Sequence, residues 1–196
     1  MSREFATSDT HWFHKNVSKY CADTRRGITP AEVDEQLIEA WNRRVTPKDI
    51  VYHLGDLSFG TVEQTRELLK RLNGKIVLIL GNHDEEQSWL KDEQCLNRFE
   101  KIVDRLRLNY NGSRFVLDHY PIHEWRNKHR GWCHLHGHSH GYTDSWGMRR
   151  FDVGVDARPD NLMEPWDMAQ LQEILMRRPM VDREHSDGRA KPAVQW

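Results

Sequence analysis

The succession of a strand, a helix and a second strand in the first half of the chain most constrains its fold. Residues 50–54 and 75–80 are predicted to be short strands, and the segment from about residue 61 to 72 is predicted to be a helix. Thr61 and Gln64 form a capping box at the start of this helix, and Asn73-Gly74 supplies its end. Parallel strands need a long crossover connection, usually a helix, and a helix is what lies between these two predicted strands. The sequence therefore predicts an α/β fold with partly parallel strands.

Local signals predict several further elements. Thr29-Pro30-Ala31-Glu32 marks the start of a helix, with a capping box, a proline at the first helical position, and Ile28 and Val33 as a hydrophobic staple. Asn111-Gly112 is a strong hairpin signal, which joins a strand near residues 102–109 to one near residues 114–117. The remaining predicted elements are strands at residues 5–8, 133–136 and 151–155, and a helix at residues 168–176.

The length of 196 residues suits one compact domain. We expect this domain to span residues 1–180, followed by a mobile polar tail at residues 181–196. The formal net charge of -1 creates no overall field toward nucleic acid or a membrane surface. Strong binding to long nucleic acids is therefore not expected.

Membrane and secretion signals are absent from the sequence pattern. Residues 1–7 are polar and mixed, unlike a signal peptide, and the longest purely apolar run, residues 76–80, is far too short to span a bilayer. Cys21, Cys95 and Cys133 are scattered and odd in number, so they do not indicate a disulfide framework. These observations favour a cytoplasmic protein.

Side chains that can bind metals follow the predicted strands. In α/β sheets, ligands bind at the carboxyl ends of strands. Side chains of Asp, Asn and His supply oxygen and imidazole ligands but no thiolate, which suits Mn, Fe, Zn or Ni and argues against a structural zinc site. The sequence therefore makes one metal site at this edge plausible, formed by residues just past the strand ends: Asp9, Asp56, Asn82, His119 and His138.

The order of the motifs resembles that of a known family. Taken singly, Asp9-Thr10-His11 and Gly55-Asp56 are weak signals, whereas Gly81-Asn82-His83-Asp84 and Gly137-His138-Ser139-His140 are specific. Together with His119, this ordered set resembles the calcineurin-like metallophosphoesterases from Asp9 through His140, and looks closest to their small single-domain bacterial and phage members. Trp41-Asn42, residues 51–56 and His119-Tyr120-Pro121 add to the resemblance.

The resemblance implies a four-layer αββα sandwich of two mixed sheets flanked by helices, with two divalent metal ions. Manganese is favoured, with iron, zinc or nickel as alternatives. One ion would be held by Asp9, His11 and His140, and the other by Asn82, His119 and His138. Asp56 would bridge both ions, while His83 would face the substrate and assist the leaving group. His138 and His140 are two residues apart, so on an extended segment their rings would point the same way.

The implied reaction is hydrolysis of a phosphoester by a hydroxide that bridges the two metals. The charge of two divalent ions exceeds that of two carboxylates and one hydroxide by a single unit, which suits a phosphodiester anion. The favoured substrate is therefore a small phosphodiester derived from a nucleotide or nucleic acid. Phosphomonoesterases and pyrophosphohydrolases share the same signature and remain alternatives.

Candidate substrate contacts flank the ligand motifs. His14 follows His11, and His123, Trp125 and Arg126 follow His119. Aromatic rings interleaved with cations suit a stacked base with a phosphate. A loop anchored by its tryptophans, and histidines that only support the ligands or lie on the surface, would explain the same residues. Both interpretations stay open.

Two rival interpretations concern the class of protein. Metallo-β-lactamase-fold enzymes carry His-x-His-x-Asp-His, which residues 136–140 superficially resemble, but Ser139 stands where that motif has Asp. A non-catalytic metal-binding scaffold of the calcineurin-like fold is expected to lose ligands or the catalytic histidine. Here every position is filled, including His83. Metal content and turnover of a generic phosphodiester separate an enzyme from a scaffold.

Overall fold

The structure, a computed structural model, describes residues 2–25, 29–142 and 148–180. Its first sheet has the strand order β4-β3-β2-β1-β9. Strands β1 to β4 run parallel to one another, and β9 pairs antiparallel with β1. The bounds of these strands are Glu4–Thr7 for β1, Ile50–His53 for β2, Lys75–Ile79 for β3, Phe99–Val103 for β4 and Trp166–Asp167 for β9.

The second sheet has the order β5-β6-β7-β8. Strands β5 (Arg105–Tyr110) and β6 (Ser113–Asp118) form the predicted hairpin. Its turn residues Asn111 and Gly112 have φ values of 45° and 82°, as a two-residue hairpin loop requires. Strands β7 (Cys133–His136) and β8 (Arg150–Asp152) continue the sheet in parallel with β6.

The two longest helices begin at the predicted capping boxes. In α2 (Pro30–Arg44) the Thr29 hydroxyl accepts from the Glu32 amide, and in α3 (Val62–Arg71) Thr61 accepts from Gln64. Each box satisfies backbone amides that have no partner within the helix. The other α-helices are α1 (Val17–Tyr20), α4 (Glu93–Leu96) and α5 (Met168–Met176), and the 3₁₀ helices are η1 (Ser88–Lys91), η2 (Lys128–Arg130) and η3 (Val155–Ala157).

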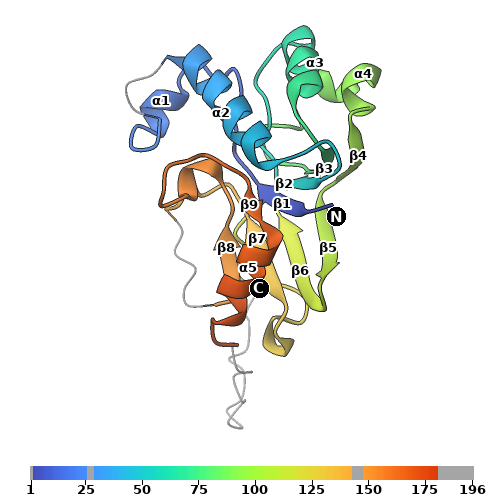
Figure 1. Cartoon of the computed structure of the whole chain (residues 1–196), viewed down its shortest axis with the longest axis vertical. Helices are drawn as coiled ribbons and strands as arrows, with labels where there is room; N and C mark the ends of the chain where they lie inside the picture. The colour runs from blue at the N-terminus through green and yellow to red at the C-terminus, as the bar shows by residue number, and fades with distance from the viewer. Residues whose placement is uncertain (1, 26–28, 143–147, 181–196) are drawn as a thin grey trace, which may run out of the picture.

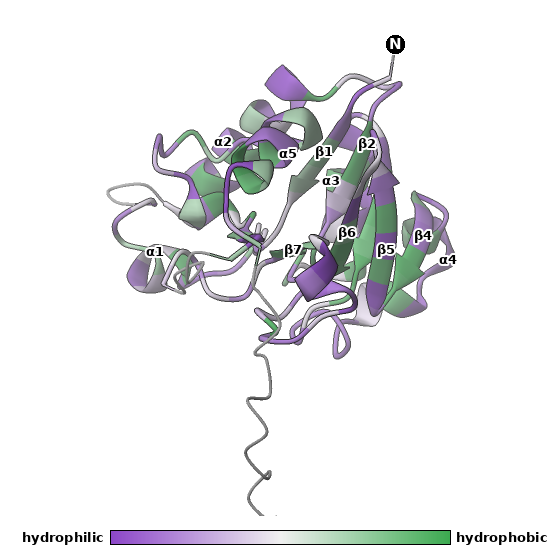
Figure 2. Cartoon of the chain, turned by 90° about the horizontal axis from the view of Figure 1, so that it is seen from below, coloured by the Kyte–Doolittle hydropathy of each residue, from purple (hydrophilic) through white to green (hydrophobic). Residues whose placement is uncertain are grey.

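The two sheets pack face to face, with α2 and α3 against the outer face of the first sheet (Figure 1). Phe5, Val51 and Ile76 point toward these helices, whereas their neighbours Ala6, Tyr52 and Val77 point toward the second sheet. Figure 2 shows the hydrophobic residues concentrated on the strands and hydrophilic residues on the surrounding loops. Successive residues of β1, β2 and β3 thus point to opposite faces of the first sheet, and both faces are buried. This arrangement confirms the α/β sandwich of two mixed sheets.

The outer face of the second sheet is covered differently from that of the first. Val116 of β6 packs there against Trp125 and Met148, with Ile122 and Trp132 at the margin. The segment that carries Trp125 and Trp132 contains the short η2 and no long helix. Helix α5, which is predicted correctly at both ends, packs its Leu171 and Leu175 into the core between the sheets.

The expected strand at residues 102–109 is wrong in one respect. The structure divides it at Asp104, so Ile102 belongs to β4 in the first sheet and the rest belongs to β5 in the second. The alternating apolar residues that predicted one strand therefore belong to two strands in different sheets. The expected strand at residues 151–155 ends at Asp152, and Val155 starts a 3₁₀ turn instead. Ile28, half of the predicted staple, and the predicted tail at residues 181–196 lie outside the described residues.

Among the described residues, no helix is both long enough and apolar enough to cross a bilayer.

Candidate metal centre

The predicted ligands come together at the carboxyl ends of strands from both sheets. Asp9 follows β1, Asp56 follows β2 and Asn82 follows β3, while His119 follows β6 and His138 follows β7. The backbone in these loops is strained, because φ is positive in five of the candidate ligands, a conformation that residues with side chains rarely adopt. These residues are Asp9, His11, Asp56, His138 and His140.

Glycines allow the ligand loops to approach one another closely. A Cβ atom on Gly81 would collide with the Asp56 carboxylate, and one on Gly137 would collide with the Asp9 carboxylate and the Ser8 hydroxyl. The glycine that precedes each of Asn82 and His138 in the sequence is therefore needed for close packing of neighbouring loops, not only for a turn.

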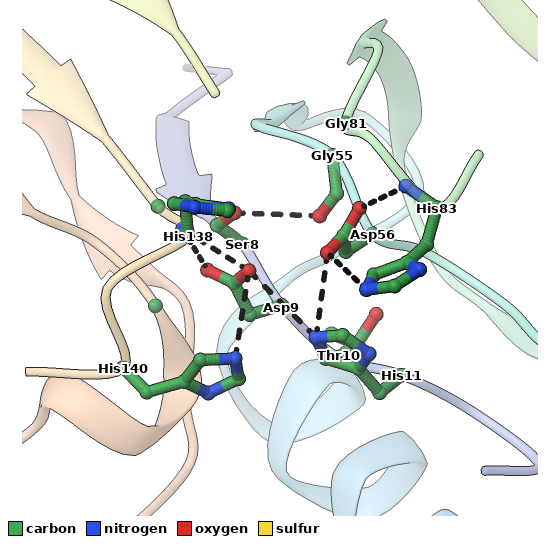
Figure 3. Close-up of polar contacts among 12 residues, drawn as sticks. Ser8, Asp9, Thr10, His11, Gly55, Asp56, Gly81, His83, His138 and His140 are labelled. Carbon is green, nitrogen blue, oxygen red and sulfur yellow. Dashed lines mark hydrogen bonds and ion pairs between the residues drawn. The ribbon is translucent and has the colours of Figure 1, made fainter. Parts of the chain in front are cut away.

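One group of ligand atoms surrounds the Asp9 carboxylate. Atoms of Asp9, His11 and His140 lie within 4.8 Å of one another. Figure 3 shows the imidazoles of His11 and His140 directed toward Asp9. The Nε2 atom of His11 is buried without a hydrogen-bond partner, 3.7 Å from Asp9 Oδ1 and 3.6 Å from Asp56 Oδ2. A buried imidazole nitrogen facing two carboxylates is satisfied by a cation between them.

A second group forms around Asn82. The Oδ1 atom of Asn82 lies 2.9 Å from His119 Nε2 and 3.0 Å from His138 Nδ1. His119 Nδ1 lies 2.7 Å from the Leu54 carbonyl, which can only accept, so Nδ1 carries the proton and Nε2 carries a lone pair. The lone pairs of His119 and Asn82 then face each other. A divalent cation bound to both would replace this repulsion with coordination.

Asp56 lies between the two groups. Its Oδ2 atom is 3.6 Å from His11 Nε2 and 3.6 Å from His119 Nε2. Asp9 is also close to both sides, since it lies within 4.8 Å of Asp56 and His119 as well as of His11 and His140. The donor set of oxygen and imidazole atoms thus fits two adjacent divalent cations.

The electrostatics of the centre favour an ionised Asp9. Burial alone would raise the pKa of Asp9, but its interactions with His11, His140 and His119 hold this pKa below its ordinary value. Burial is the main cause that lowers the pKa of His138, and the neighbouring His119 imidazole lowers it further. A carboxylate kept ionised beside an imidazole kept neutral is the protonation pattern that metal ligation needs.

The segment that carries His138 and His140 differs from the expectation. It is not extended, because φ is 66° at His138 and 45° at His140. The two rings therefore serve different places: His138 faces Asn82 and His119, whereas His140 faces Asp9 and Asp156.

Two residues that support His140 were missed in the sequence. Asp156 Oδ2 lies 2.9 Å from His140 Nδ1, which leaves Nε2 directed toward Asp9. Arg25 is fully buried, pairs with both Asp156 oxygens at 2.9 and 2.8 Å, and donates to the backbone carbonyls of Asp9 and Thr10. Burial alone would lower the pKa of His140, but Asp156 holds it well above its ordinary value. The separation of 131 positions between Arg25 and Asp156 offers no local sequence signal.

Asp84 organises the backbone of the centre. Its two carboxylate oxygens accept hydrogen bonds from the amides of Asp56, Leu57 and Gly81 at 2.8 to 2.9 Å. Desolvation by burial raises the pKa of Asp84 to about 6. Asp84 therefore holds the loops after β2 and β3 in place through their backbone amides.

His83 lies beside the ligands and faces a cavity. Its Nε2 atom is 4.0 Å from Asp56 Oδ2, and about half of its side chain, 51%, is exposed (Figure 3). The adjacent cavity, with a volume of about 470 Å³, is also lined by His11, His14 and His140. The predicted substrate contact His14 is thus placed at the centre, on the same cavity as His83.

The other predicted substrate contacts lie elsewhere. Trp125 is only 7% exposed, donates from Nε1 to the Trp132 carbonyl and packs on the second sheet. Arg126 lines a separate hollow with Arg105 and Arg107. His123 is exposed and pairs with Glu124 at 3.2 Å. Of the two interpretations left open for this loop, the burial of the Trp125 ring favours the packing anchor.

Comparison with known proteins agrees with this geometry. A family model described as calcineurin-like phosphoesterase matches residues 5–181. An uncharacterized protein of Methanocaldococcus jannaschii is 39% identical over 143 residues, covering 71% of this chain and 70% of that protein. The gene 66 protein of Mycobacterium phage D29 is 33% identical over 186 residues, covering 82% and 91%.

Among solved structures, a protein of unknown function from Aquifex aeolicus aligns with a TM-score of 0.66 and 22% identity, over 89% of this chain and 100% of the other. This likeness shows the shared fold. The family model, which matches most of the chain, shows that the protein belongs to the calcineurin-like phosphoesterases, a family of metal-dependent phosphoesterases.

Proposed function

We propose that this protein is a dinuclear-metal-dependent phosphodiesterase that acts on a phosphodiester derived from a nucleotide or nucleic acid. The observation that carries the proposal is the position of the 470 Å³ cavity, which is lined both by the candidate ligands His11 and His140 and by His83. A phosphoester seated there reaches a candidate metal ligand and a candidate proton donor from one position.

In this proposal Asp9, His11 and His140 hold one ion, and Asn82, His119 and His138 hold the other. Asp56 would help to hold both ions, in keeping with the equal distance of 3.6 Å from its Oδ2 atom to the Nε2 atoms of His11 and His119. Bound divalent ions, with manganese favoured, lower the pKa of coordinated water and neutralise charge on phosphoryl oxygens. The carboxylates and imidazoles fix the positions of these ions, and Asp84 and Asp156 fix the positions of the ligands.

His83 assists the departure of the leaving group. Its backbone amide donates to Asp56 Oδ1 at 3.0 Å, which ties the residue to the centre, while its ring extends into the cavity. An imidazole in this position can donate a proton to the departing alkoxide oxygen. Its Nε2 atom lies 4.0 Å from the nearest carboxylate oxygen of Asp56, which supports a role outside the ligand set.

The charge of the cavity supports a diester over a monoester or a pyrophosphate. Among the described residues that line it there is no Lys or Arg. Dianionic and polyphosphate groups are commonly gripped by guanidinium or ammonium groups in addition to metals. A diester carries one negative charge, which the metals alone can balance.

The test is turnover of a panel of substrates by protein loaded with each candidate metal in turn. Bis(4-nitrophenyl) phosphate, 4-nitrophenyl phosphate, a 2′,3′-cyclic nucleotide and a nucleoside diphosphate represent the competing classes. We expect the diesters to give the highest kcat/KM, with manganese the most effective metal. Preference for the monoester or the diphosphate would assign the protein to one of the alternatives. Binding of two ions without turnover of any substrate would identify a scaffold.

We also propose that the protein acts in the cytoplasm. Cys21, Cys95 and Cys133 are free thiols, and each is buried. Buried unpaired thiols are compatible with a reducing compartment. Fractionation of the source cells tests this placement directly.

A further inference from the structure

Two highly exposed tyrosines stand at the rim of one cavity. Tyr20 is 72% exposed and Tyr142 is 83% exposed, and both line the cavity that contains His83. Tyr20 ends helix α1, and Tyr142 follows the turn that carries His138 and His140. Large rings left in water beside a hollow are characteristic of ligand sites, because they gain little from folding alone.

A third ring, that of Phe59, lies inside the cavity among imidazoles. It stacks on His11 with a centroid distance of 5.4 Å and an interplanar angle of 19°, and it meets His14 edge-on at 4.5 Å. Its centroid is 5.1 Å from that of His83. Phe59 therefore has a fixed orientation next to the residue that serves the leaving group.

The chemistry of the lining selects the class of ligand group. The described residues that line the cavity include no carboxylate, Lys or Arg, but do include aromatic rings, Val17 and the Cys21 thiol. A sugar or a second phosphate would need several charged or amide partners, which these residues do not provide. A planar, uncharged heterocycle finds rings for stacking and imidazole or phenol groups at its edge.

We propose that this cavity is a nucleobase site, in which Tyr20, Phe59 and Tyr142 hold the base of the substrate and determine substrate preference. The inference rests on the proposed function, since the phosphate of the same molecule is taken to lie at the metal centre. His83 lines the same cavity, so the nucleoside bound there is the leaving group of the reaction.

The experiment measures binding to metal-loaded protein by calorimetry and does not depend on turnover. The probes are AMP, UMP, ribose 5-phosphate and inorganic phosphate. AMP and ribose 5-phosphate carry the same sugar phosphate, so the ratio of their Kd values reports the base alone. One stacked base is worth about 1–3 kcal/mol, so we expect AMP or UMP to bind roughly 5- to 150-fold more tightly than ribose 5-phosphate.

The variants locate the base. In the double variant Tyr20→Ala/Tyr142→Ala, the ratio of the Kd of ribose 5-phosphate to the Kd of AMP should fall to within about threefold of unity. The double variant Tyr20→Phe/Tyr142→Phe should retain the wild-type ratio, because phenylalanine rings also stack. Leu162→Ala removes a side chain that is 48% exposed and does not line the cavity, and it should leave the ratio unchanged. Circular dichroism verifies the fold of each variant.

Tyr120 provides the contrasting position, because its ring lies 4.8 Å from that of His138, outside the cavity lining. Loss of the ratio in Tyr120→Ala, with the ratio intact in the double alanine variant, would place the base there and overturn the inference. A wild-type ratio near unity would also overturn it, while binding of inorganic phosphate together with diester turnover would leave the proposed function standing. If none of the four probes binds while bis(4-nitrophenyl) phosphate is turned over, the nucleobase site fails and the proposed function stands. Absence of both probe binding and diester turnover would refute both proposals.

Discussion

Replacing Asp156 with Asn removes the charge behind His140 while keeping the size of the side chain. Asp156 Oδ2 lies 2.9 Å from His140 Nδ1 and 2.8 Å from Arg25 Nη2, and Oδ1 lies 2.9 Å from Arg25 Nε. Both oxygens therefore accept from Arg25. Whichever way the introduced amide were turned, its NH₂ group would face a guanidinium N–H, so one charge-assisted hydrogen bond is lost in either orientation.

The size of the effect follows from these contacts. Losing a hydrogen bond to a charged group costs about 1.5–3 kcal/mol. Changing a residue that orients a metal-binding histidine costs about 10- to 100-fold in metal affinity, which corresponds to about 1.4–2.8 kcal/mol. The first cost falls on the stability of the fold and the second on metal affinity, so Asp156→Asn should weaken one of the two metal sites by about 10- to 100-fold. The site held by Asn82, His119 and His138 should change much less.

The assay is metal titration of chelator-treated protein, with Mn²⁺ and with Zn²⁺, followed by calorimetry. Asp160→Asn is the matched control, because Asp160 also pairs with both sides of an arginine, Arg158, at 2.9 and 2.6 Å, and touches no candidate ligand. We expect Asp160→Asn to bind metal at two sites with wild-type affinities, and Asp156→Asn to bind metal more weakly at one of its two sites. Equal affinities in the two variants would refute the reasoning.

Three further substitutions test other parts of the centre. Asp56→Ala should remove bound metal and activity together, and elemental analysis that still finds two ions per chain would contradict a bridging role. His83→Ala should keep both ions but slow an alkyl-linked diester by about 10²–10⁴-fold, and a nitrophenyl ester by distinctly less; equal losses would argue against leaving-group assistance. Burial lowers the pKa of His53 to about 3, so below pH 6.5 only the unfolded chain takes up this proton. Stability of the metal-free protein should therefore decline from pH 6.5 toward pH 3, by up to about 1.4 kcal/mol per pH unit for this residue, and denaturant unfolding should show a shallower decline in His53→Gln.

The elements predicted correctly are those with signals confined to neighbouring residues. The capping boxes at Thr29 and Thr61 operate across three positions, and Asn111-Gly112 determines its hairpin turn by itself. The ligand motifs could also be recognised, because each comes just after a predicted strand and several of them begin with a glycine. The fold class follows from these local signals together with the order of strands and helices.

What the sequence did not reveal depends on contacts between distant segments. The change of sheet at Asp104 and the short antiparallel β9 are decided by packing of the whole sandwich. Arg25 and Asp156 are unremarkable singly, and only their burial together behind His140 gives them a role. Trp125 shows why its role stayed open, since an aromatic residue among basic ones fits both a base platform and a packing anchor. Only burial distinguishes the two.

The loops of the centre are held to one another by hydrogen bonds from backbone amides to carboxylates, in addition to any contacts with metal. Asp84 accepts amides from the loops after β2 and β3, Asp9 accepts the His138 amide at 2.9 Å, and Asp56 accepts the His83 amide at 3.0 Å. These bonds offset the cost of left-handed backbone at Asp9, Asp56 and His138, about 1–3 kcal/mol each. Each of them joins two protein groups and needs no metal as a partner.

Chelation should therefore leave the protein folded, unlike small zinc domains that unfold when the metal is removed. Metal should raise the midpoint of thermal unfolding only by mass action, with about 2.7 kcal/mol gained at a free concentration 100 times the Kd. Far-UV circular dichroism at 25 °C should be the same with metal or chelator. The near-UV signal should also persist for the buried Trp12, three residues after Asp9, and Trp41, whose ring centroids lie 6.0 Å apart. Loss of either signal on chelation would mean that the metal, and not the backbone contacts, holds these loops in place.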